Sequence, residues 1–577
     1  MMAHNARLDD ANRGNSLNPH VRIGLTTSLP GMANMLSTMQ DEQLSLATLL
    51  NYGTSVYSDS KIVTWTGDGV RGYSFGELGL EAARLANALV SLGVDQGDRV
   101  GTFMWNNNEH MAAYAAIPAM GAVLHTLNIR LFPEQLIFVT NHLDDKVILV
   151  DATVVPLLAA VLPQLRSVKH IIVCNGDAEI AAPGVTVHAY RDLLDAHPTT
   201  YAWPDIDERW AAAACYTSGT TGDPKGVIYS HRSMWLHSMQ VCTGNGMGLS
   251  ESDNTLAIVP MFHAMSWGLP HASLMCGASL VMPDRFLQPG PIAEILASQR
   301  PTFSAAVPTI WLGLLQHLEA NPQDISHLRS VVVGGSAVPP SLMHAFEDKF
   351  NVPILQAWGM TETSPLASVA HAPSKAEGEE RWKYRYTQGR HPANVRMRVV
   401  GDDGRVLPSD GEAVGEIEVR GEWITGSYYS PDGAAIDPEK FRDGWLRTGD
   451  VGHVSRDGYL TLVDRSKDVI KSGGEWISSV DLENDVMSNP DVAEAAVVGV
   501  PDEKWDERPL VAVVRTPGSS ITAEQLRTFL DGKVAKWQLP ERWTFVDEVP
   551  KTSVGKFDKK RIRAQYADGE LDVVTLG

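Results

Sequence analysis

Residues 216–227 form a glycine- and threonine-rich loop whose composition is suited to binding a polyphosphate. The segment reads YTSGTTGDPKGV, so backbone N–H groups, hydroxyl groups and the Lys225 ammonium are available to phosphate oxygens. It differs from the P-loop of NTPases, because Lys225 follows Pro224 and precedes glycine instead of serine or threonine. A flexible surface loop is the structural alternative for such a composition, but the complete string favours phosphate binding.

The loop resembles the phosphate-binding signature of the adenylate-forming superfamily, which includes acyl-CoA synthetases, adenylation domains and firefly-type luciferases. The resemblance covers nearly the whole chain, because further motifs of the superfamily follow in the same order. GGSAV (334–338) and QAWGMTET (356–363) are similar to the adenine and catalytic segments, and WLRTGD (445–450) to the ribose segment. DRSKDVIKSGGEWIS (464–478) is similar to the hinge and CoA-channel segment, and PKTSVGK (550–556) to the segment with the catalytic lysine.

The resemblance implies a role for each matching residue. The residues implied in binding ATP and AMP are Thr217, Ser218, Gly219, Thr220, Thr221, Gly222, Lys225, Gly334, Gly335, Ser336, Trp358, Gly359, Asp450 and Arg465. The residues implied in catalysis are Lys556, Glu362 and Thr361, with Glu362 also the ligand of Mg²⁺. Lys467 is implied as the hinge, and Gly473, Gly474 and Trp476 as the CoA channel.

The residue types fit the adenine and catalytic roles physically. Trp358 offers a flat apolar face to adenine, and the glycines at 334 and 335 let the backbone approach the edge of the ring. Thr361 can donate a hydrogen bond to the α-phosphate, and the Glu362 carboxylate is a hard oxygen ligand of the kind that Mg²⁺ prefers. Taken alone, the tryptophan is more often a core residue and the glutamate a solvated or capping one.

The roles implied for Asp450 and Lys556 depend more on the surrounding motif than on the residue type. Asp450 can accept hydrogen bonds from both ribose hydroxyls, although an isolated aspartate in a TGD turn is more often a turn former. Lys556 lies in a basic run, where a lysine is usually a solvated surface charge. The resemblance makes it the residue that bridges the substrate carboxylate and the α-phosphate, where a placed ammonium stabilises the developing charge. The neighbouring residues Lys559, Lys560, Arg561 and Arg563 keep the surface interpretation, with CoA phosphate contact as the minority alternative.

Residues 259–267, VPMFHAMSW, resemble the gate segment of fatty-acyl-CoA synthetases. The resemblance implies an acyl pocket lined by His263, Trp267, Val307 and Met360, although a lone histidine on an apolar segment is more often a core residue. The segment has no basic residue to pair a second carboxylate, which favours a plain aliphatic tail over a diacid. Trp476 is also more similar to fatty-acyl enzymes than to acetyl or aryl ones.

The apolar patterns predict an α/β fold: a large N-terminal body of layered, mostly parallel sheets plus a β-rich subdomain, followed by a small, mobile α+β C-terminal domain. Predicted elements are helices at 75–92 and 133–142, strands at 99–104, 147–151 and 170–174, and antiparallel strands at 395–400, 416–420 and 459–463. The small domain should contain strands at 494–500 and 510–515 and a helix from Thr522. We predict domains at 1–464 and 465–577.

Composition excludes several other classes of protein. The formal net charge of −21 and the pI near 5.3 argue against nucleic-acid binding. The four cysteines have no CxxC spacing, which argues against an ordinary zinc site and a disulfide framework and fits a reducing cytoplasm. The N-terminus lacks the apolar core of a signal peptide. The uncharged stretch 111–129 contains a proline and polar residues, so a buried helix running into a core strand is favoured over a transmembrane segment.

Together, these features predict that the protein uses Mg²⁺, ATP and CoA to convert a medium- or long-chain fatty acid into acyl-AMP and then acyl-CoA. The alternatives are a ligase for a short-chain or aryl acid, an acyl-AMP ligase that serves a carrier protein, a luciferase-like oxidase and a non-catalytic acyl-nucleotide sensor. The sensor predicts loss of Lys556 or Glu362, and both are present. The resemblance is also compatible with a homodimer. The sequence does not specify the acyl chain length.

Overall fold

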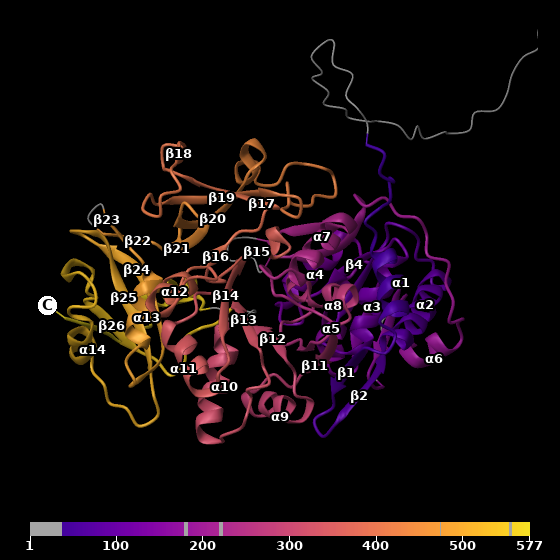
Figure 1. Ribbon diagram of the computed structural model, residues 1–577, viewed down its shortest axis with the longest axis horizontal. Coiled ribbons are helices and arrows are strands. Elements are labelled where there is room, and N and C mark those ends of the chain that lie inside the picture. The colour runs from indigo at the N-terminus through magenta and orange to yellow at the C-terminus, as the bar shows by residue number, and fades with distance from the viewer. Residues whose placement is uncertain are drawn as a thin grey trace, which may run out of the picture. The chain divides into compact units, whose positions relative to one another are not determined.

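Three β-sheets with their helices make up the described part of the chain (Figure 1). The structure, a computed structural model, describes residues 37–177, 180, 183–217, 223–472, 475–552 and 557–576, with only the backbone of residues 475 and 476. Short 3-10 or irregular turns connect several elements. They are η1 (Ala152–Val154), η2 (Leu162–Gln164), η3 (Ala264–Gly268), η4 (Thr361–Thr363), η5 (Pro438–Gly444) and η6 (Lys536–Gln538).

A seven-stranded sheet forms the first layer. Its spatial order is β7 (Thr186–Ala189), β6 (His170–Cys174), β5 (Val147–Asp151), β3 (Arg99–Phe103), β4 (Val123–Thr126), β8 (Ala211–Tyr216) and β9 (Gly226–Ser230). All neighbouring pairs are parallel except the β8–β9 hairpin. Along β5, Val147 and Leu149 join one apolar core and Ile148 and Val150 the other, because successive side chains of a strand point to opposite faces. Both faces are therefore buried under helices.

The helices of this layer divide between the two faces of the sheet. They are α1 (Leu46–Val56), α2 (Phe75–Ser91), α3 (Asn108–Ala119), α4 (Pro133–Leu143), α5 (Val155–Val161), α6 (Tyr190–Asp195) and α7 (His231–Cys242). Residues of α1–α3 contribute to one core and residues of α4 and α5 to the other. The start of α2 is fixed by a capping box, in which Ser74 and Glu77 each accept a backbone N–H of the other.

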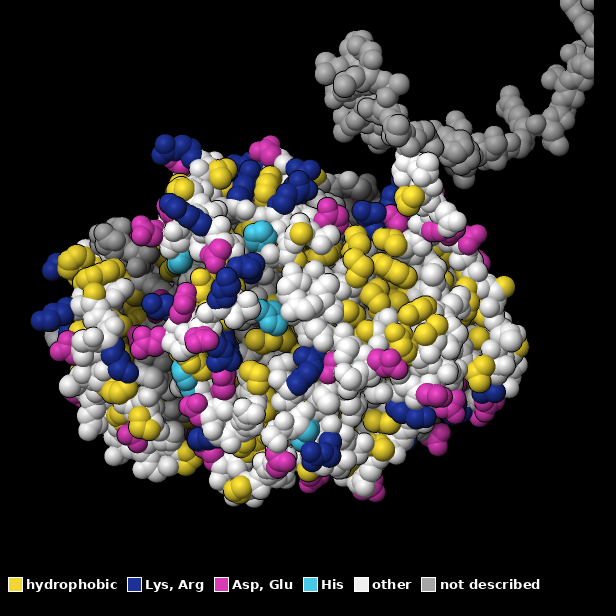
Figure 2. Space-filling view, in the orientation of Figure 1, with side chains coloured by type: hydrophobic (Ala, Val, Ile, Leu, Met, Phe, Trp, Pro, Cys, Tyr) yellow, Lys and Arg dark blue, Asp and Glu magenta, His cyan; other side chains and the backbone are white. Residues whose placement is uncertain are grey.

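Hydrophobic side chains also gather on part of the surface, over the N-terminal half of the face in Figure 2.

A fourteen-stranded sheet combines a parallel and an antiparallel half. Its order is β18 (Val406–Leu407), β17 (Val395–Val400), β19 (Gly415–Gly421), β20 (Leu446–Val454), β21 (Tyr459–Arg465), β16 (Gly389–Arg390), β15 (Leu366–Val369), β14 (Ile354–Gly359), β13 (Ser330–Gly334), β12 (Phe303–Ala306), β10 (Asn254–Leu256), β11 (Ser279–Met282), β1 (Lys61–Trp65) and β2 (Val70–Ser74). The strands from β14 to β1 pair in parallel, and those from β18 to β14 pair antiparallel. The associated helices are α8 (Leu269–Cys276), α9 (Pro289–Gln299), α10 (Pro308–Ala320), α11 (Pro340–Phe350) and α12 (Gly378–Arg385).

The C-terminal region forms a separate, six-stranded sheet. Its path is β23 (Glu475–Ile477), β22 (Ile470–Ser472), β25 (Asp506–Arg515), β26 (Arg542–Phe545) and β27 (Val573–Thr575), and β24 (Val492–Asp502) also pairs with β25. Its helices are α13 (Ser479–Met487), α14 (Ala523–Leu530) and α15 (Lys559–Ala567). Two apolar clusters drawn wholly from residues 470–576 lie around this sheet. The predicted fold class, a large sheet-rich body with a small α+β domain, is confirmed.

The uncharged stretch 111–129 has the predicted structure, a buried helix followed by a strand. It begins within α3, whose residues are all buried, and runs through β4 in the middle of the seven-stranded sheet. Alanine-rich sequence suits this place, because small side chains let α3 pack closely on every side. No helix in the described ranges is both long and apolar enough to cross a membrane.

Candidate active site

The phosphate-binding segment is the loop of the β8–β9 hairpin. Its two ends are joined where the Thr217 N–H donates to the Lys225 carbonyl (2.9 Å) and the Lys225 N–H donates to Thr217 Oγ1 (3.1 Å). Gly226 allows close packing, because a Cβ there would lie 3.0 Å from the ring of Tyr216. The predicted ligands at 218–222 lie outside the described residues. The described stem holds both ends of the loop in fixed positions.

The Lys225 ammonium lies between a carboxylate and an aromatic ring. Its Nζ is 2.7 Å from Asp437 Oδ2 and 4.9 Å from the ring centroid of Tyr428. Both Lys225 and Asp437 remain partly exposed to solvent. Sequence reasoning assigned Lys225 to phosphate but did not find Asp437, which lies in a segment without a recognisable motif.

Glu362, the predicted metal ligand, is held in a buried position on the short η4 turn. Glu362 is only 5% exposed, and the hydroxyl of Tyr428 donates a 2.5 Å hydrogen bond to its Oε1. Burial, and then the Glu362 carboxylate, raise the pKa of Tyr428, so its hydroxyl stays protonated and acts as the donor. The neighbouring Thr361 is also buried, and its carbonyl accepts from the Tyr229 hydroxyl at 2.8 Å. A single hard carboxylate with one oxygen already bonded suits Mg²⁺, which keeps water and phosphate ligands.

Asp450, the predicted ribose ligand, is fixed through both of its oxygens. Trp358 Nε1 donates to Oδ2 at 2.8 Å, and Arg465 Nε lies 3.3 Å from Oδ1. Asp450 is 5% exposed, and its charge is the main cause that raises the pKa of Arg465. Three residues that the sequence assigned to the nucleotide, from β14, β20 and β21, therefore form one hydrogen-bonded group. The Trp358 ring itself packs in the core of the antiparallel half.

Val307, Gly334 and Gly359 follow or end three neighbouring parallel strands. Val307 comes directly after β12, Gly334 ends β13 and Gly359 ends β14. Because the strands are parallel, their carboxyl ends meet at the same edge of the sheet, where open α/β sheets bind ligands. A Cβ on Gly334 would lie 2.7 Å from a backbone oxygen and 3.4 Å from Trp267 Cη2, so the glycine lets the adenine and gate segments approach. Gly335 has φ +89°, which also favours glycine.

The gate segment adopts an unusual backbone conformation that the sequence did not reveal. Residues 264–267 all have positive φ, between 41° and 54°, and none of them is glycine. A left-handed residue costs roughly 1–2 kcal/mol, so surrounding contacts must hold this turn. Within the turn, the Ser266 hydroxyl donates to the Val259 carbonyl at 2.7 Å. Asn106 fixes the chain just before the turn: its Nδ2 donates to the carbonyls of Ala257 and Val259 at 2.7 and 2.8 Å, and its Oδ1 accepts from the Met261 N–H at 2.7 Å.

The remaining predicted residues in the large body lie around these segments. His263 and Met360 are half-buried, Trp267 is 7% exposed and Ser336 is exposed. Trp267 belongs to the same apolar cluster as Phe303 of β12 and Ala357 of β14. The structure thus brings the gate and nucleotide segments together.

The predicted hinge and small-domain residues are only partly described. Burial is the first cause that lowers the pKa of Lys467, and its carbonyl accepts from Arg563 at 3.3 Å. Lys556, Gly473 and Gly474 lie outside the described residues, as does the side chain of Trp476, whose backbone pairs with Lys471.

The surface interpretation is wrong for Lys559. Its side chain is 12% exposed, and its Nζ lies 2.8 Å from Glu483 Oε1 and 2.6 Å from the Ser479 hydroxyl. The basic composition of the run concealed this buried ion pair. Lys559 therefore has a packing role in the small domain.

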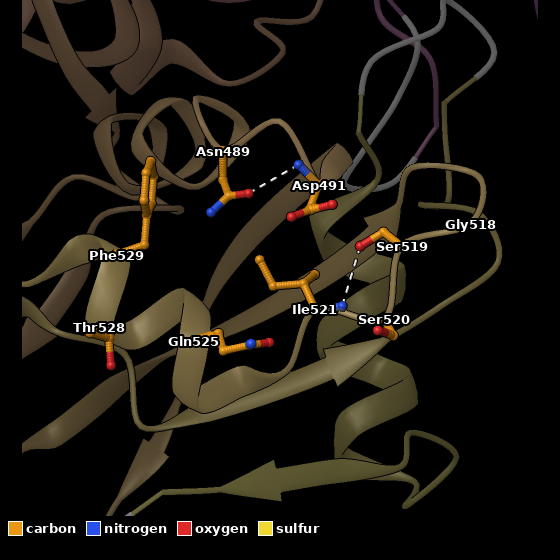
Figure 3. A pocket seen from close by; sticks show the side chains of 9 residues that line it. All are labelled: Asn489, Asp491, Gly518, Ser519, Ser520, Ile521, Gln525, Thr528 and Phe529. Carbon is orange, nitrogen blue, oxygen red and sulfur yellow. Dashed lines mark hydrogen bonds between the residues drawn. The ribbon is translucent and has the colours of Figure 1, made fainter.

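An open hollow of about 500 Å³ on the small domain contains none of the predicted site residues (Figure 3). It is lined by residues of α14 and of the loops at 489–491 and 518–521. Two of its polar side chains bond to the local backbone: Asn489 accepts from the Asp491 N–H, and Ser519 from the Ile521 N–H. The hollow is therefore separate from the candidate active site.

No group of three or more His, Cys, Asp or Glu side chains in the described ranges is arranged to hold a metal ion. Tyr428 and Asp437 contact the predicted site residues Glu362 and Lys225, and the sequence did not reveal them, because a tyrosine and an aspartate in a loop have no signature of their own. A buried carboxylate on a tyrosine, a second carboxylate held by a tryptophan and an arginine, and a glycine- and threonine-rich loop are together the arrangement expected of an adenylate-forming enzyme.

Comparison with known proteins gives the same class. The chain matches the family described as AMP-binding enzyme over residues 54–429 and the AMP-binding enzyme C-terminal domain over residues 481–556. The first match alone covers more than half of the chain. This protein belongs to the AMP-binding enzyme family, and the superfamily indicated by its motifs is confirmed.

Similar proteins span almost the same length. The chain is 43% identical over 542 residues to a 3-methylmercaptopropionyl-CoA ligase of Ruegeria lacuscaerulensis, covering 92% of this chain and 99% of the relative. It is 40% identical to a medium-chain-fatty-acid–CoA ligase of Ectopseudomonas oleovorans, covering 92% and 98%. It is 43% identical to a long-chain-fatty-acid–CoA ligase of Thermus thermophilus, covering 92% and 97%.

Solved structures of similar fold include two enzymes with bound nucleotide. An anthranilate CoA ligase in complex with anthranoyl-AMP has a TM-score of 0.82 and 26% identity, covering 91% of this chain and 98% of that one. ATP-bound MatB from Rhodopseudomonas palustris has a TM-score of 0.77 and 26% identity, covering 91% and 99%.

Proposed function

We propose that the protein is an ATP-dependent ligase that converts a medium- or long-chain fatty acid into its CoA thioester. The observation that carries this proposal is the meeting of Gly334 and Trp267, which sets the gate segment against the nucleotide segment at the carboxyl ends of β13 and β14. An apolar acyl chain and a nucleotide can thus converge on one point. The relatives named as medium- and long-chain ligases support the same substrate class.

In the first half-reaction, the carboxylate attacks the α-phosphorus of ATP, and pyrophosphate leaves. Asp450 would accept the ribose hydroxyls, Thr361 would donate to the α-phosphate, and Lys225 would exchange Asp437 for phosphate oxygens. Glu362 would hold Mg²⁺, because its buried carboxylate keeps one oxygen on Tyr428 and presents a hard donor with the other. When bound, Mg²⁺ would neutralise part of the phosphate charge.

In the second half-reaction, the CoA thiol attacks the acyl carbonyl and AMP leaves. We assign the small domain to residues 465–577 and the hinge to Lys467, which lies between the last strand of the fourteen-stranded sheet and the first of the six-stranded sheet. Rotation about this hinge would withdraw Lys556 after adenylation and bring Gly473 and Gly474 to the active site. Glycines leave room there for the narrow pantetheine arm.

The substrate class is tested by measuring AMP formation with CoA across acetate, pentanoate, octanoate, palmitate and benzoate. Each buried CH₂ contributes about 0.8 kcal/mol, so kcat/KM should rise about fourfold per CH₂ until the pocket is full. A best substrate of acetate or benzoate would contradict the fatty-acyl proposal.

A second candidate substrate is 3-methylmercaptopropionate, because relatives 43% and 40% identical to this chain are named as ligases for that acid. This thioether acid has the length of pentanoate, so the two compounds compare sulfur with CH₂ at equal length. A kcat/KM for the thioether acid above that for octanoate would favour the second candidate.

The alternating-domain mechanism is tested by separating the half-reactions. Lys556→Ala should lower acid-dependent pyrophosphate release by about 10²–10³-fold, as for one lost electrostatic donor, yet still convert supplied acyl-AMP and CoA. Gly473→Leu should block the pantetheine path while acyl-AMP still forms. Parallel loss of both half-reactions in both variants would contradict the mechanism.

We also propose a cytoplasmic homodimer, which gel filtration and cell fractionation would test.

A further inference from the structure

A buried histidine–aspartate pair lies beside the phosphate loop and has no role in the site described above. His125 of β4 is 1% exposed, and its Nδ1 lies 2.8 Å from Oδ2 and 3.0 Å from Oδ1 of the fully buried Asp145. Among the described residues, no hydrogen-bond partner lies within reach of the other ring nitrogen, Nε2. An unpaired buried polar atom costs about 1–3 kcal/mol, so this nitrogen has a hydrogen-bonding capacity that the described residues leave unused.

The imidazole of His125 lines a small cavity between the phosphate loop and the gate segment. The cavity walls include His125, Tyr216, Thr217, Phe262 and His263. Its volume is about 10 Å³, which admits roughly one water-sized group. Thr217 begins the phosphate loop and His263 belongs to the gate, so the cavity adjoins both parts of the active site. His125, bound to Asp145 through Nδ1, thus forms part of the wall of this cavity.

The proposed reaction needs a proton acceptor in only one of its half-reactions. Adenylation joins a carboxylate to phosphorus and removes no proton from the acid. Thioester formation must remove the proton of the CoA thiol, and an ordinary thiol has a pKa of about 8.5 and is mostly protonated at neutral pH. A histidine, whose ordinary pKa is near neutrality, is the usual residue for this task.

We propose that Nε2 of His125 accepts the thiol proton and that Asp145 is its positioning residue, an inference that rests on the acyl-CoA ligase function proposed above. The S–H proton passes to Nε2 through the one water that the cavity admits, and the electron pair of that bond forms the new S–C bond to the acyl carbonyl carbon. The bond from this carbon to the phosphate oxygen breaks, and its electrons leave with AMP. Asp145 stabilises the imidazolium, as a buried carboxylate does on Nδ1 of other catalytic histidines. The proton then passes to solvent.

The test is His125→Gln, assayed in each half-reaction separately. Adenylation is measured as acid-dependent pyrophosphate release with hydroxylamine as the acceptor, and thioester formation as conversion of supplied acyl-AMP and CoA. Adenylation should stay within about twofold of wild type, whereas thioester formation should fall by about 10²–10⁴-fold, the usual contribution of a general base. Asp145→Asn should cause a similar selective loss and provides a second variant if His125→Gln does not fold.

Raising the pH separates proton transfer from a structural effect. As the pH rises from 7 to 9.5 the CoA thiol ionises by itself, so the deficit of His125→Gln relative to wild type should shrink toward unity. Other titratable or charged groups near the pair are Tyr216 of β8, His142 of α4, Arg99 of β3 and Asp144 after α4. Because wild type and variant share these groups, the ratio of their rates isolates His125.

The matched control is His110→Gln. His110 is also fully buried, but both of its ring nitrogens are bonded, to the Trp105 carbonyl at 2.9 Å and to Thr102 Oγ1 at 3.0 Å. Its replacement should lower the melting temperature without separating the half-reactions.

Three results would overturn the inference: equal loss of both half-reactions in His125→Gln, a deficit that does not change with pH, or a selective loss in His263→Gln with none in His125→Gln. Failure of the wild-type protein to form acyl-AMP or acyl-CoA would instead refute the proposed function, and the proton-transfer role with it.

Discussion

Replacing Tyr428 with phenylalanine should weaken the enzyme's use of Mg²⁺ without changing the shape of the site. The lost group is a hydroxyl that donates a 2.5 Å hydrogen bond to Glu362 Oε1, and both residues are only 5% exposed. A hydrogen bond to a charged group contributes roughly 1.5–3 kcal/mol. At 1.4 kcal/mol for each factor of ten, the half-saturating Mg²⁺ concentration should rise about 10- to 100-fold. The physical reason is that Glu362 would lose the hydrogen-bond donor that fixes its rotamer. Residues that hydrogen-bond to a metal ligand affect metal affinity in this way.

The assay is acid-dependent pyrophosphate release at fixed ATP over a range of free Mg²⁺, with direct Mn²⁺ binding measured by EPR as a readout independent of turnover. Tyr429→Phe is the matched control, because the adjacent tyrosine packs its ring on His142 (5.4 Å between centroids), away from Glu362. Melting temperatures would be compared for both variants. An unchanged Mg²⁺ dependence in Tyr428→Phe, together with a lower melting temperature, would show that the hydroxyl is purely structural and refute the reasoning.

Three other substitutions have defined outcomes. Gly334→Ala places a Cβ 2.7 Å from a backbone oxygen, so strands β13 and β14 must shift. The kcat/KM for ATP should fall at least about tenfold, which corresponds to a loss of about 1.4 kcal/mol. Unchanged kinetics would contradict the close approach. Asp437→Asn frees Lys225 from a partly exposed ion pair that contributes about 0.2–1 kcal/mol. The KM for ATP should therefore fall about 1.4- to 5-fold. A rise in this KM would mean that Asp437 assists ATP binding. Lys559→Met leaves Glu483 buried without its partner, so urea unfolding should show that the free energy of unfolding of the small domain falls by about 3–5 kcal/mol. A fall below about 1 kcal/mol would restore the surface interpretation of Lys559.

Much of the fold could be predicted from local apolar patterns. The strands at 147–151, 170–174 and 395–400 have the predicted bounds, because a short apolar or alternating run between polar residues leaves little choice of register. The helix predicted at 75–92 is α2, which ends one residue earlier. The positions of the strands within the sheets could not be predicted, because they depend on packing between segments far apart in the chain. The fourteen-stranded sheet, which joins a parallel to an antiparallel half, is the clearest example.

The chemistry of the site divides in the same way. The sequence alone predicted the phosphate loop, Glu362 and Asp450 as site residues, because each belongs to a short motif whose residue types act together; their roles stay predictions. Only the tertiary structure brought Tyr428 to Glu362, since nothing in the sequence around a tyrosine specifies the partner of its hydroxyl.

Buried charges and backbone strain also had to come from the tertiary structure. The basic run around Lys559 predicts a solvated surface, yet α13 and α15 both pack on β24, and the side chain of Lys559 pairs with Glu483 of α13 away from water. Residues 264–267 contain no glycine to signal a left-handed turn, and Asn106, from a distant loop, fixes the residues just before that turn. The sequence determines the chemistry of groups that lie within a few residues of one another. Burial and contacts across the fold decide which of those groups are charged, bonded or strained.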